Sequence, residues 1–139
     1  MGCLAMTYSE MLEIAKSKLN PKKLNKHAKM GDAVCVIETK NNTIYCGVSL
    51  IVSGNVGFCA EQGAIAEMIK DGETVIKRAL IIDKFYHILP PCGKCRELIS
   101  AIDRENKNAE FYVSSSQTVM LYELLPYDWK DIKDNGVFQ

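Results

Sequence analysis

Two prolines lead directly into a pair of cysteines in the segment Pro90-Pro91-Cys92-Gly93-Lys94-Cys95-Arg96. Apolar residues then recur at helical spacing at Leu98, Ile99 and Ile102, so the sequence predicts a helix over residues 92–104. Cysteines three positions apart at a helix start can both reach one metal ion. The free amide groups and the helix dipole at such a start also favour the thiolate form that binds a metal.

A third cysteine, Cys59, begins another predicted helix over residues 60–69. Together with Cys92 and Cys95 it offers three thiolates to a zinc ion and leaves the fourth tetrahedral position for water. Glu61 lies two residues after Cys59, about 200° around the helix, which makes it a neighbour of the metal and not necessarily a ligand. A carboxylate there can move protons between water and a leaving nitrogen, as hydrolytic removal of an amino group requires.

Helices and strands are expected to alternate along the rest of the chain. The expected segments are a helix from Thr7 to Asn20-Pro21, a basic linker over residues 22–29, an antiparallel hairpin of residues 33–37 and 43–50 around Asn41-Asn42, a central strand over 75–83, a short strand over 110–113, and a strand or helix over 119–125. This alternation predicts an α/β sandwich of two or three layers, built as a single domain over residues 1–139.

The composition excludes several classes of function. Of 139 residues, 47% are hydrophobic and 24% are charged, as in an ordinary globular protein. Seventeen basic and seventeen acidic residues cancel, so no bulk positive field holds a polynucleotide. No apolar run approaches the roughly 20 residues of a membrane-spanning helix, and no secretion signal is evident. We therefore expect a cytoplasmic protein with a small-molecule partner.

The two cysteine motifs resemble those of the cytidine deaminase family. Cys59-Ala60-Glu61 and the downstream Pro91-Cys92-Gly93-Lys94-Cys95-Arg96 match the family's zinc signature. The similarity runs from about residue 7 to Pro126, and Glu123-Leu124-Leu125-Pro126 resembles the family's Leu-Leu-Pro ending. The resemblance implies a cytidine deaminase-like α/β/α sandwich with a mixed central sheet, assembled as a homotetramer.

The same resemblance implies a zinc-dependent hydrolase. One Zn²⁺ per subunit is expected on Cys59, Cys92 and Cys95, with Glu61 moving protons while activated water displaces ammonia from a cytosine-like ring. Three thiolates and a Cys-x-Glu motif resemble the small free-nucleoside enzymes, whereas polynucleotide editors carry His in place of Cys59. The implied reaction converts cytidine or deoxycytidine to uridine or deoxyuridine, as in pyrimidine salvage.

The sugar-binding stretch departs from the family pattern. Family members hold the ribose with Gly-x-Asn-x-Glu, and the matching stretch here is Gly47-Val48-Ser49-Leu50-Ile51. Ser49 is expected to contact substrate in place of the Asn, but Ile51 cannot accept a sugar hydroxyl, which costs about 1.5 to 3 kcal/mol of binding. Blasticidin S deaminases also lack this Glu, so that antibiotic or another aminopyrimidine is the alternative substrate.

Further contacts follow from the resemblance. Ala60 and Pro91 are expected to border the substrate, and Trp129 to cover the base or to lie at an interface. Gln62 stands where the family carries an Arg that offsets the negative charge of three thiolates. Arg96, directly after Cys95, is expected to supply that charge.

Two other interpretations of the cysteines stay open. Cys92-Gly93-Lys94-Cys95 alone also fits a thioredoxin-like redox pair. Alternatively, the zinc is structural, with His27 or His87 as its fourth ligand, in a protein of the same fold that does not catalyse. Glu61 separates this last interpretation from an enzyme, because a closed structural site has no use for a carboxylate beside an open metal position.

Overall fold

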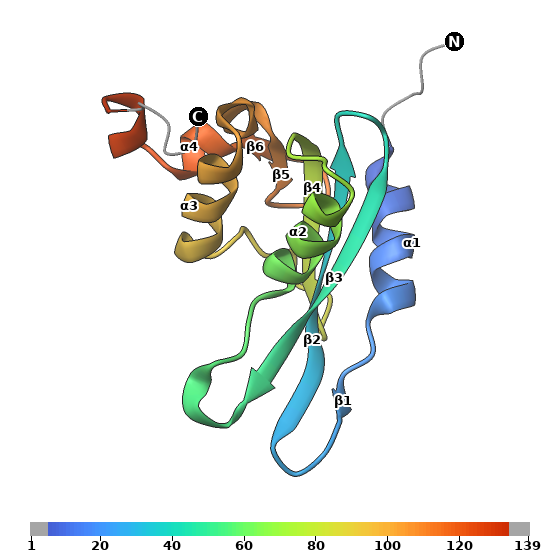
Figure 1. Cartoon of the computed structure of the whole chain (residues 1–139). Helices are drawn as coiled ribbons and strands as arrows, with labels where there is room; N and C mark the ends of the chain where they lie inside the picture. Colours follow the sequence, from blue (N-terminus) through green and yellow to red (C-terminus); the bar gives the residue numbers. More distant parts are fainter. Residues whose placement is uncertain (1–5, 134–139) are drawn as a thin grey trace.

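Helices and strands alternate in the computed structural model, which describes residues 6–133 (Figure 1). The helices are α1 (Tyr8–Lys18), α2 (Ala60–Lys70), α3 (Gly93–Ile102) and α4 (Leu121–Leu124), with short 3-10 turns at Ser53–Asn55, Arg104–Asn108 and Trp129–Asp131. The strands are β1 (Lys22–Lys23), β2 (Ala28–Thr39), β3 (Ile44–Val52), β4 (Ile76–Asp83), β5 (Glu110–Tyr112) and β6 (Thr118–Met120).

The six strands form one mixed sheet. Its order is β1-β2-β4-β5-β6, and β3 pairs with β2. The predicted antiparallel hairpin is confirmed as β2 and β3, and β4 lies inside the sheet between β2 and β5 as its continuous apolar sequence predicts. Only β4 and β5 run parallel among the pairs of the described residues, and α3 connects them.

Helices cover both faces of this sheet, which confirms a three-layer α/β/α sandwich (Figure 1). On one face, Met11 and Ala15 of α1 pack against apolar residues of β2 and β4. On the other, Ala64 of α2 and Ile99 of α3 pack against the opposite sides of the same strands. The two cysteine-bearing helices therefore share a face, and the sheet holds them side by side.

Two segments differ from their sequence-based expectation. The prediction of a basic linker over residues 22–29 is wrong in part, because Lys22–Lys23 pairs with β2 and β2 itself begins at Ala28. Apolar runs do not reveal this start, since backbone pairing requires no apolar side chain. Residues 119–125, which fit either strand or helix, contain both, because β6 ends at Met120 and α4 follows at once.

Membrane-spanning helices are absent from the part of the chain that the structure describes. None of its helices combines the length and the hydropathy needed to cross a bilayer.

Candidate active site

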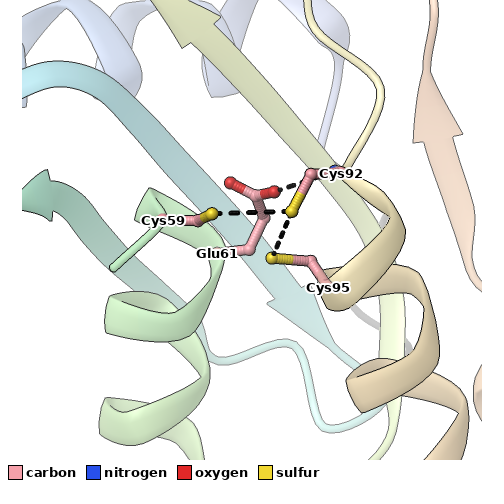
Figure 2. A group of neighbouring side chains, drawn as sticks. All are labelled: Cys59, Glu61, Cys92 and Cys95. Atoms are coloured by element: carbon pink, nitrogen blue, oxygen red, sulfur yellow. Dashed lines mark hydrogen bonds between the residues drawn. The ribbon is translucent and has the colours of Figure 1, made fainter. Parts of the chain in front are cut away.

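Three cysteines meet where the N-termini of α2 and α3 converge (Figure 2). Cys59 is the N-cap of α2, Cys92 is the N-cap of α3, and Cys95 lies in the first turn of α3. The Sγ atoms of Cys59 and Cys92 are 3.5 Å apart, and those of Cys92 and Cys95 are 3.2 Å apart. The structure thus brings together the three sulfurs that the sequence singles out.

A buried carboxylate completes the cluster. Glu61 is only 6% exposed, and one ligand atom from each of the four residues lies within 4.8 Å of the others. The backbone N–H of Cys92 donates to Oε2 of Glu61 at an N···O distance of 3.4 Å. Neither histidine of the chain belongs to this cluster among the described residues, and His87 instead pairs with Asp83 at 2.8 Å.

The donor set fits a zinc ion. With Zn–S bonds of about 2.3 Å, two sulfurs of a tetrahedral site lie about 3.8 Å apart. The observed 3.2 and 3.5 Å separations reach that value after movements of a few tenths of an ångström. Three thiols supply three positions of a tetrahedral site, and Glu61 lies close enough to offer a fourth ligand atom or to act on a water molecule bound there. A two-cysteine redox pair does not require Cys59.

The proton affinities of the three thiols differ. Burial raises the pKa of Cys95 well above its usual range, and the neighbouring Cys92 thiol raises it further. Burial also raises the pKa of Cys59. At Cys92, burial opposes ionisation, but hydrogen bonds from Cys95 and Cys59 outweigh it and lower the pKa. Holding all three as thiolates beside Glu61 therefore calls for a bound cation to offset their mutual repulsion.

Close packing between β3 and α2 sets the position of Cys59. A Cβ added to Gly47 would lie 2.0 Å from the backbone nitrogen of Ala64 and 2.4 Å from the carbonyl oxygen of Ala60. Only glycine lets the helix approach the strand so closely. Leu50 and Phe58 then exchange two backbone hydrogen bonds of 2.9 and 3.0 Å, which fix the chain immediately before Cys59.

A cavity of about 270 Å³ opens beside the cluster, slightly below the roughly 300 Å³ at which small-molecule pockets usually begin. Its walls are mostly apolar. They are formed by Ala33, Ser49, Leu50, Ile51, Phe58, Cys59, Ala60, Glu61, Ile81, Leu89, Pro90 and Cys92. The predicted substrate contacts Ser49 and Ala60 thus line the cavity with Glu61, as does Ile51.

Ser49 and Pro91 also have structural contacts. The Oγ of Ser49 accepts a hydrogen bond from the backbone N–H of Ala33 at 3.0 Å, and its hydroxyl proton can still be donated. Pro91 is buried and does not line the cavity, whose lining includes the adjacent Pro90 instead. The carbonyl of Pro91 accepts from Nε of Arg96 at 2.7 Å.

The two residues expected to adjust the charge at the metal make other contacts. Nη1 of Arg96 donates to the carbonyl of Leu124 at 2.9 Å, so its guanidinium ties α3 to α4 and to the loop before Cys92. Oε1 of Gln62 accepts from the backbone N–H of Cys59 at 3.1 Å. Both side chains therefore act on the backbone that carries the cysteines.

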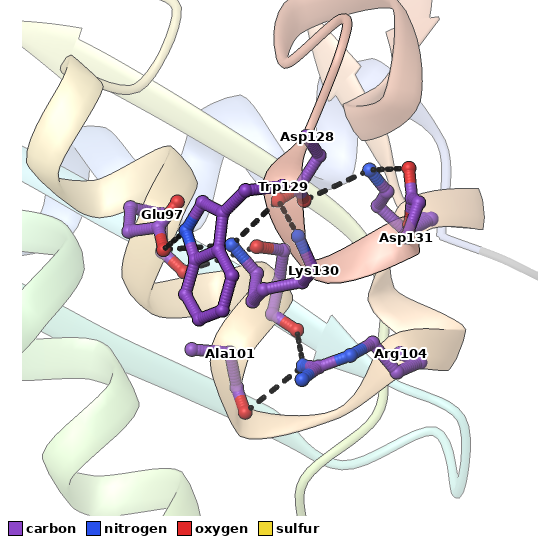
Figure 3. Close-up of polar contacts among 9 residues, drawn as sticks. Glu97, Ala101, Arg104, Asp128, Trp129, Lys130 and Asp131 are labelled. Atoms are coloured by element: carbon purple, nitrogen blue, oxygen red, sulfur yellow. Dashed lines mark hydrogen bonds and ion pairs between the residues drawn. The ribbon is translucent and has the colours of Figure 1, made fainter. Parts of the chain in front are cut away.

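Trp129 lies apart from the cavity, on the outer side of α3 (Figure 3). Its indole N–H donates to Oε1 of Glu97 at 3.2 Å, and the Lys130 amine lies 5.3 Å from its ring. Within one chain it does not reach the residues that line the cavity. Sequence reasoning missed the network around it, in which Lys130 is buried between Glu97 and Asp128. In the sequence, the alternating charges of the residues around Trp129 are the only feature that points to this network.

Comparison with known proteins agrees with this geometry. A family model described as the cytidine and deoxycytidylate deaminase zinc-binding region matches residues 6–110. No curated protein sequence matches the chain.

Solved cytidine deaminases have the same fold. The enzyme from Mycobacterium leprae has a TM-score of 0.71 at 15% identity, over 88% of this chain and 99% of that chain. The enzyme from Bacillus anthracis has a TM-score of 0.69 at 20% identity, over 90% and 91% of the two chains. The enzyme from Burkholderia pseudomallei has a TM-score of 0.69 at 16% identity, over 88% and 98%.

Proposed function

Because the chain belongs to the cytidine and deoxycytidylate deaminase family and is a zinc-dependent hydrolytic deaminase, we propose that it deaminates a free cytosine nucleoside. Cytidine or deoxycytidine would give uridine or deoxyuridine and ammonia. The observation that carries the proposal is the buried carboxylate of Glu61 beside three thiols, which can fill three of the four positions around a tetrahedral metal ion. A structural zinc site gains nothing from such a carboxylate.

In this proposal Cys59, Cys92 and Cys95 hold the metal. A zinc ion held by these three cysteines would supply a water-derived nucleophile near neutral pH. The cysteines keep the ion at the meeting point of two helix N-termini, whose positive dipole ends offset part of the negative charge of the thiolates. Gln62 orients Cys59 through its backbone N–H.

Glu61 is the proposed proton carrier. It takes one proton from the attacking water and delivers it to the ring nitrogen, and it then moves the second proton of that water from the new hydroxyl to the amino group, which leaves as ammonia. The backbone N–H of Cys92 donates to Oε2 of Glu61 and so orients the carboxylate beside the cavity. Burial keeps bulk water from competing for the proton.

The apolar cavity is the proposed site of the base. Its walls suit a flat heteroaromatic ring, and Ser49 offers a hydroxyl proton to a polar substituent. Ala60 lines the cavity next to Glu61, and the buried Pro91 is adjacent to Pro90, which also lines it. The neutral net charge of the chain favours a small ligand over a polynucleotide.

We further propose a homotetramer that works in the cytoplasm, in pyrimidine salvage, with residues 1–139 as one domain. Several large apolar side chains are exposed, among them Tyr127, Trp129 and Ile132 near the C-terminal end. Apolar surface of this kind marks contact surfaces between subunits. The five cysteines in residues 6–133 are free, which suits a reducing compartment.

One observation favours the alternative substrate. Ile51 presents an apolar side chain at the cavity wall, where it cannot accept a hydrogen bond from a sugar hydroxyl. A cytosine carried on a modified sugar, as in blasticidin S, or another aminopyrimidine would not need that hydrogen bond.

Ammonia release by the zinc-loaded protein tests the proposal. The panel holds cytidine, deoxycytidine, cytosine, blasticidin S and adenosine. The expected result is turnover of cytidine or deoxycytidine that Glu61→Ala abolishes and Glu67→Ala, an exposed change on the same helix, leaves intact. Turnover of blasticidin S alone would select the alternative. Silence across the panel, with one zinc ion bound per chain, would favour a non-catalytic zinc protein.

A further inference from the structure

A second pocket, rich in basic residues, adjoins the proposed base site. It has a volume of about 380 Å³ and lies between the β1–β2 turn and the end of β3. Its lining consists of Lys23, Asn25, Lys26, His27, Ala28, Lys29, Ile51, Val52 and Ser53. Nothing in the chemistry of Glu61 and the cysteines uses these residues.

Strand register places two of these lysines on the same face as the active site. Lys23 pairs with Lys29, and Lys29 pairs with Ile51, so the three form one row across β1, β2 and β3. Gly47 faces α2, as its contacts show, and Ile51 lies four residues further along β3 on the same face. Lys23 and Lys29 therefore extend the wall that begins beside Glu61.

The charge in this segment is compensated only in part. Residues 22–29 contain four lysines and no acidic residue, in a chain of zero net charge. Lys29 pairs with Asp32 at 3.1 Å. Within residues 6–133, neither Lys23 nor Lys26 has a carboxylate within ion-pair distance. Lysines placed directly opposite each other, as Lys23 and Lys29 are, destabilise a strand pair, and a bound anion relieves that repulsion.

Ile51 separates the two pockets and belongs to both. Its side chain is 52% exposed, so it separates the two pockets only in part. A ligand whose ring lies beside Glu61 can therefore pass over Ile51 and place a substituent among the lysines. The apolar side chain of Ile51 provides no acceptor for a sugar hydroxyl, whereas the basic pocket provides donors for an anion.

We propose that Lys23, Lys26 and Lys29 bind a negatively charged group, a phosphate or a carboxylate, on the sugar of the cytosine compound that this protein deaminates. The inference rests on the proposed function, because it places the base next to Glu61. The anionic group compensates for the hydrogen bond that Ile51 cannot make.

Equilibrium binding tests this inference without turnover. Titration calorimetry on zinc-loaded Glu61→Gln protein compares cytidine with cytidine 5′-monophosphate and with the nucleoside oxidised to a 5′-carboxylate. We expect one of the anions to bind about tenfold more tightly than cytidine. Lys23→Gln combined with Lys26→Gln removes that advantage and leaves cytidine binding unchanged. Whichever anionic ligand binds more tightly than cytidine identifies the natural group as a phosphate or a carboxylate.

Lys22→Gln is the matched control. Lys22 pairs with Met30 in the alternate row and does not line the pocket, so its loss leaves the preference for the anion intact. Equal binding of all three ligands, or an equal effect of Lys22→Gln and the double variant, overturns the inference. The ammonia assay is read separately: turnover of cytidine without any preference for anions leaves the proposed function standing while this inference fails.

Discussion

The backbone N–H of Cys92 lies 3.4 Å from Oε2 of Glu61, so one residue that the metal would use also orients the carboxylate that would move the proton. The two residues come from different helices, and this contact joins the start of α3 to the first turn of α2 (Figure 2). The position of the proposed metal ligand Cys92 and the orientation of the proposed proton carrier Glu61 therefore depend on each other.

Glu61→Gln tests the proton-transfer role directly. The amide keeps the size and the acceptor oxygen for the Cys92 N–H, but it cannot take up a proton. We expect the turnover number to fall about 10²- to 10⁴-fold with zinc content unchanged. Ammonia release and metal analysis after dialysis measure the two quantities. A parallel loss of zinc would mean that Glu61 acts mainly through the metal.

Cys95→Ser is expected to abolish zinc binding, because Cys95 is the most deeply buried of the three thiols and has no replacement nearby. Cys46→Ser serves as the control, since Cys46 is a free cysteine on the opposite face of the sheet. The zinc-to-protein ratio should fall from one to near zero only in the first variant. Full zinc retention by Cys95→Ser would contradict the ligand assignment.

Substitutions of Arg96 distinguish two roles of its side chain, which are to compensate the charge of the thiolates and to position the backbone near Cys92. Its guanidinium donates to the carbonyls of Pro91 and Leu124, so Arg96→Ala should loosen the loop before Cys92 and lower zinc content and activity together. Arg96→Lys keeps the charge but loses the forked geometry. If the lysine variant restores full activity, charge near the thiolates is what matters, as the sequence alone suggests.

The ion network around Asp128 predicts how stability depends on pH. Burial opposes ionisation of Asp128, but hydrogen bonds from Lys130 and an ion pair with Lys107 outweigh it and hold the pKa below its usual range. A carboxyl group whose pKa is lower in the folded state stabilises the protein above its unfolded pKa of about 3.9 and loses that contribution as the pH falls further.

Asp128→Asn should therefore lower the free energy of unfolding by about 2 kcal/mol at pH 7, because it removes a buried carboxylate that both Lys107 and Lys130 contact and leaves the buried Lys130 with Glu97 as its carboxylate partner. The difference from the unaltered protein should shrink in urea unfolding below about pH 4. Asp131→Asn is the control, since that carboxylate is exposed and should change stability little at any pH. A pH-independent difference would contradict the titration of Asp128.

Gly47→Ala tests the close approach of α2 to β3. The added methyl group would meet backbone atoms of Ala60 and Ala64, which cannot move independently of the helix. We expect a loss of about 1 to 3 kcal/mol in stability and weaker zinc binding, because the helix carries Cys59 on its N-terminus. Gly93→Ala, where a Cβ has open space, should do neither. Thermal unfolding and metal analysis measure both effects.

Local patterns explain why the metal cluster and its two helices could be predicted from the sequence. Pro91 and Cys92 mark the start of α3 through backbone chemistry that acts over a few residues. The position of Trp129 could not be predicted, because it depends on Glu97, thirty-two residues earlier in the chain. The early start of β2 could not be predicted for the same reason, since Ala28 pairs with Val52 of β3 and Lys29 pairs with Lys23 of β1.

Cys59 and Cys92 are thirty-three positions apart in the chain, and an ion shared between them closes a loop that contains α2 and β4. Such a closure restricts the unfolded chain much as a disulfide of that span would, but it can be reversed by a chelator. Bound zinc should therefore stabilise the folded enzyme as well as supply its chemistry, and a chelator should lower the free energy of unfolding together with the activity.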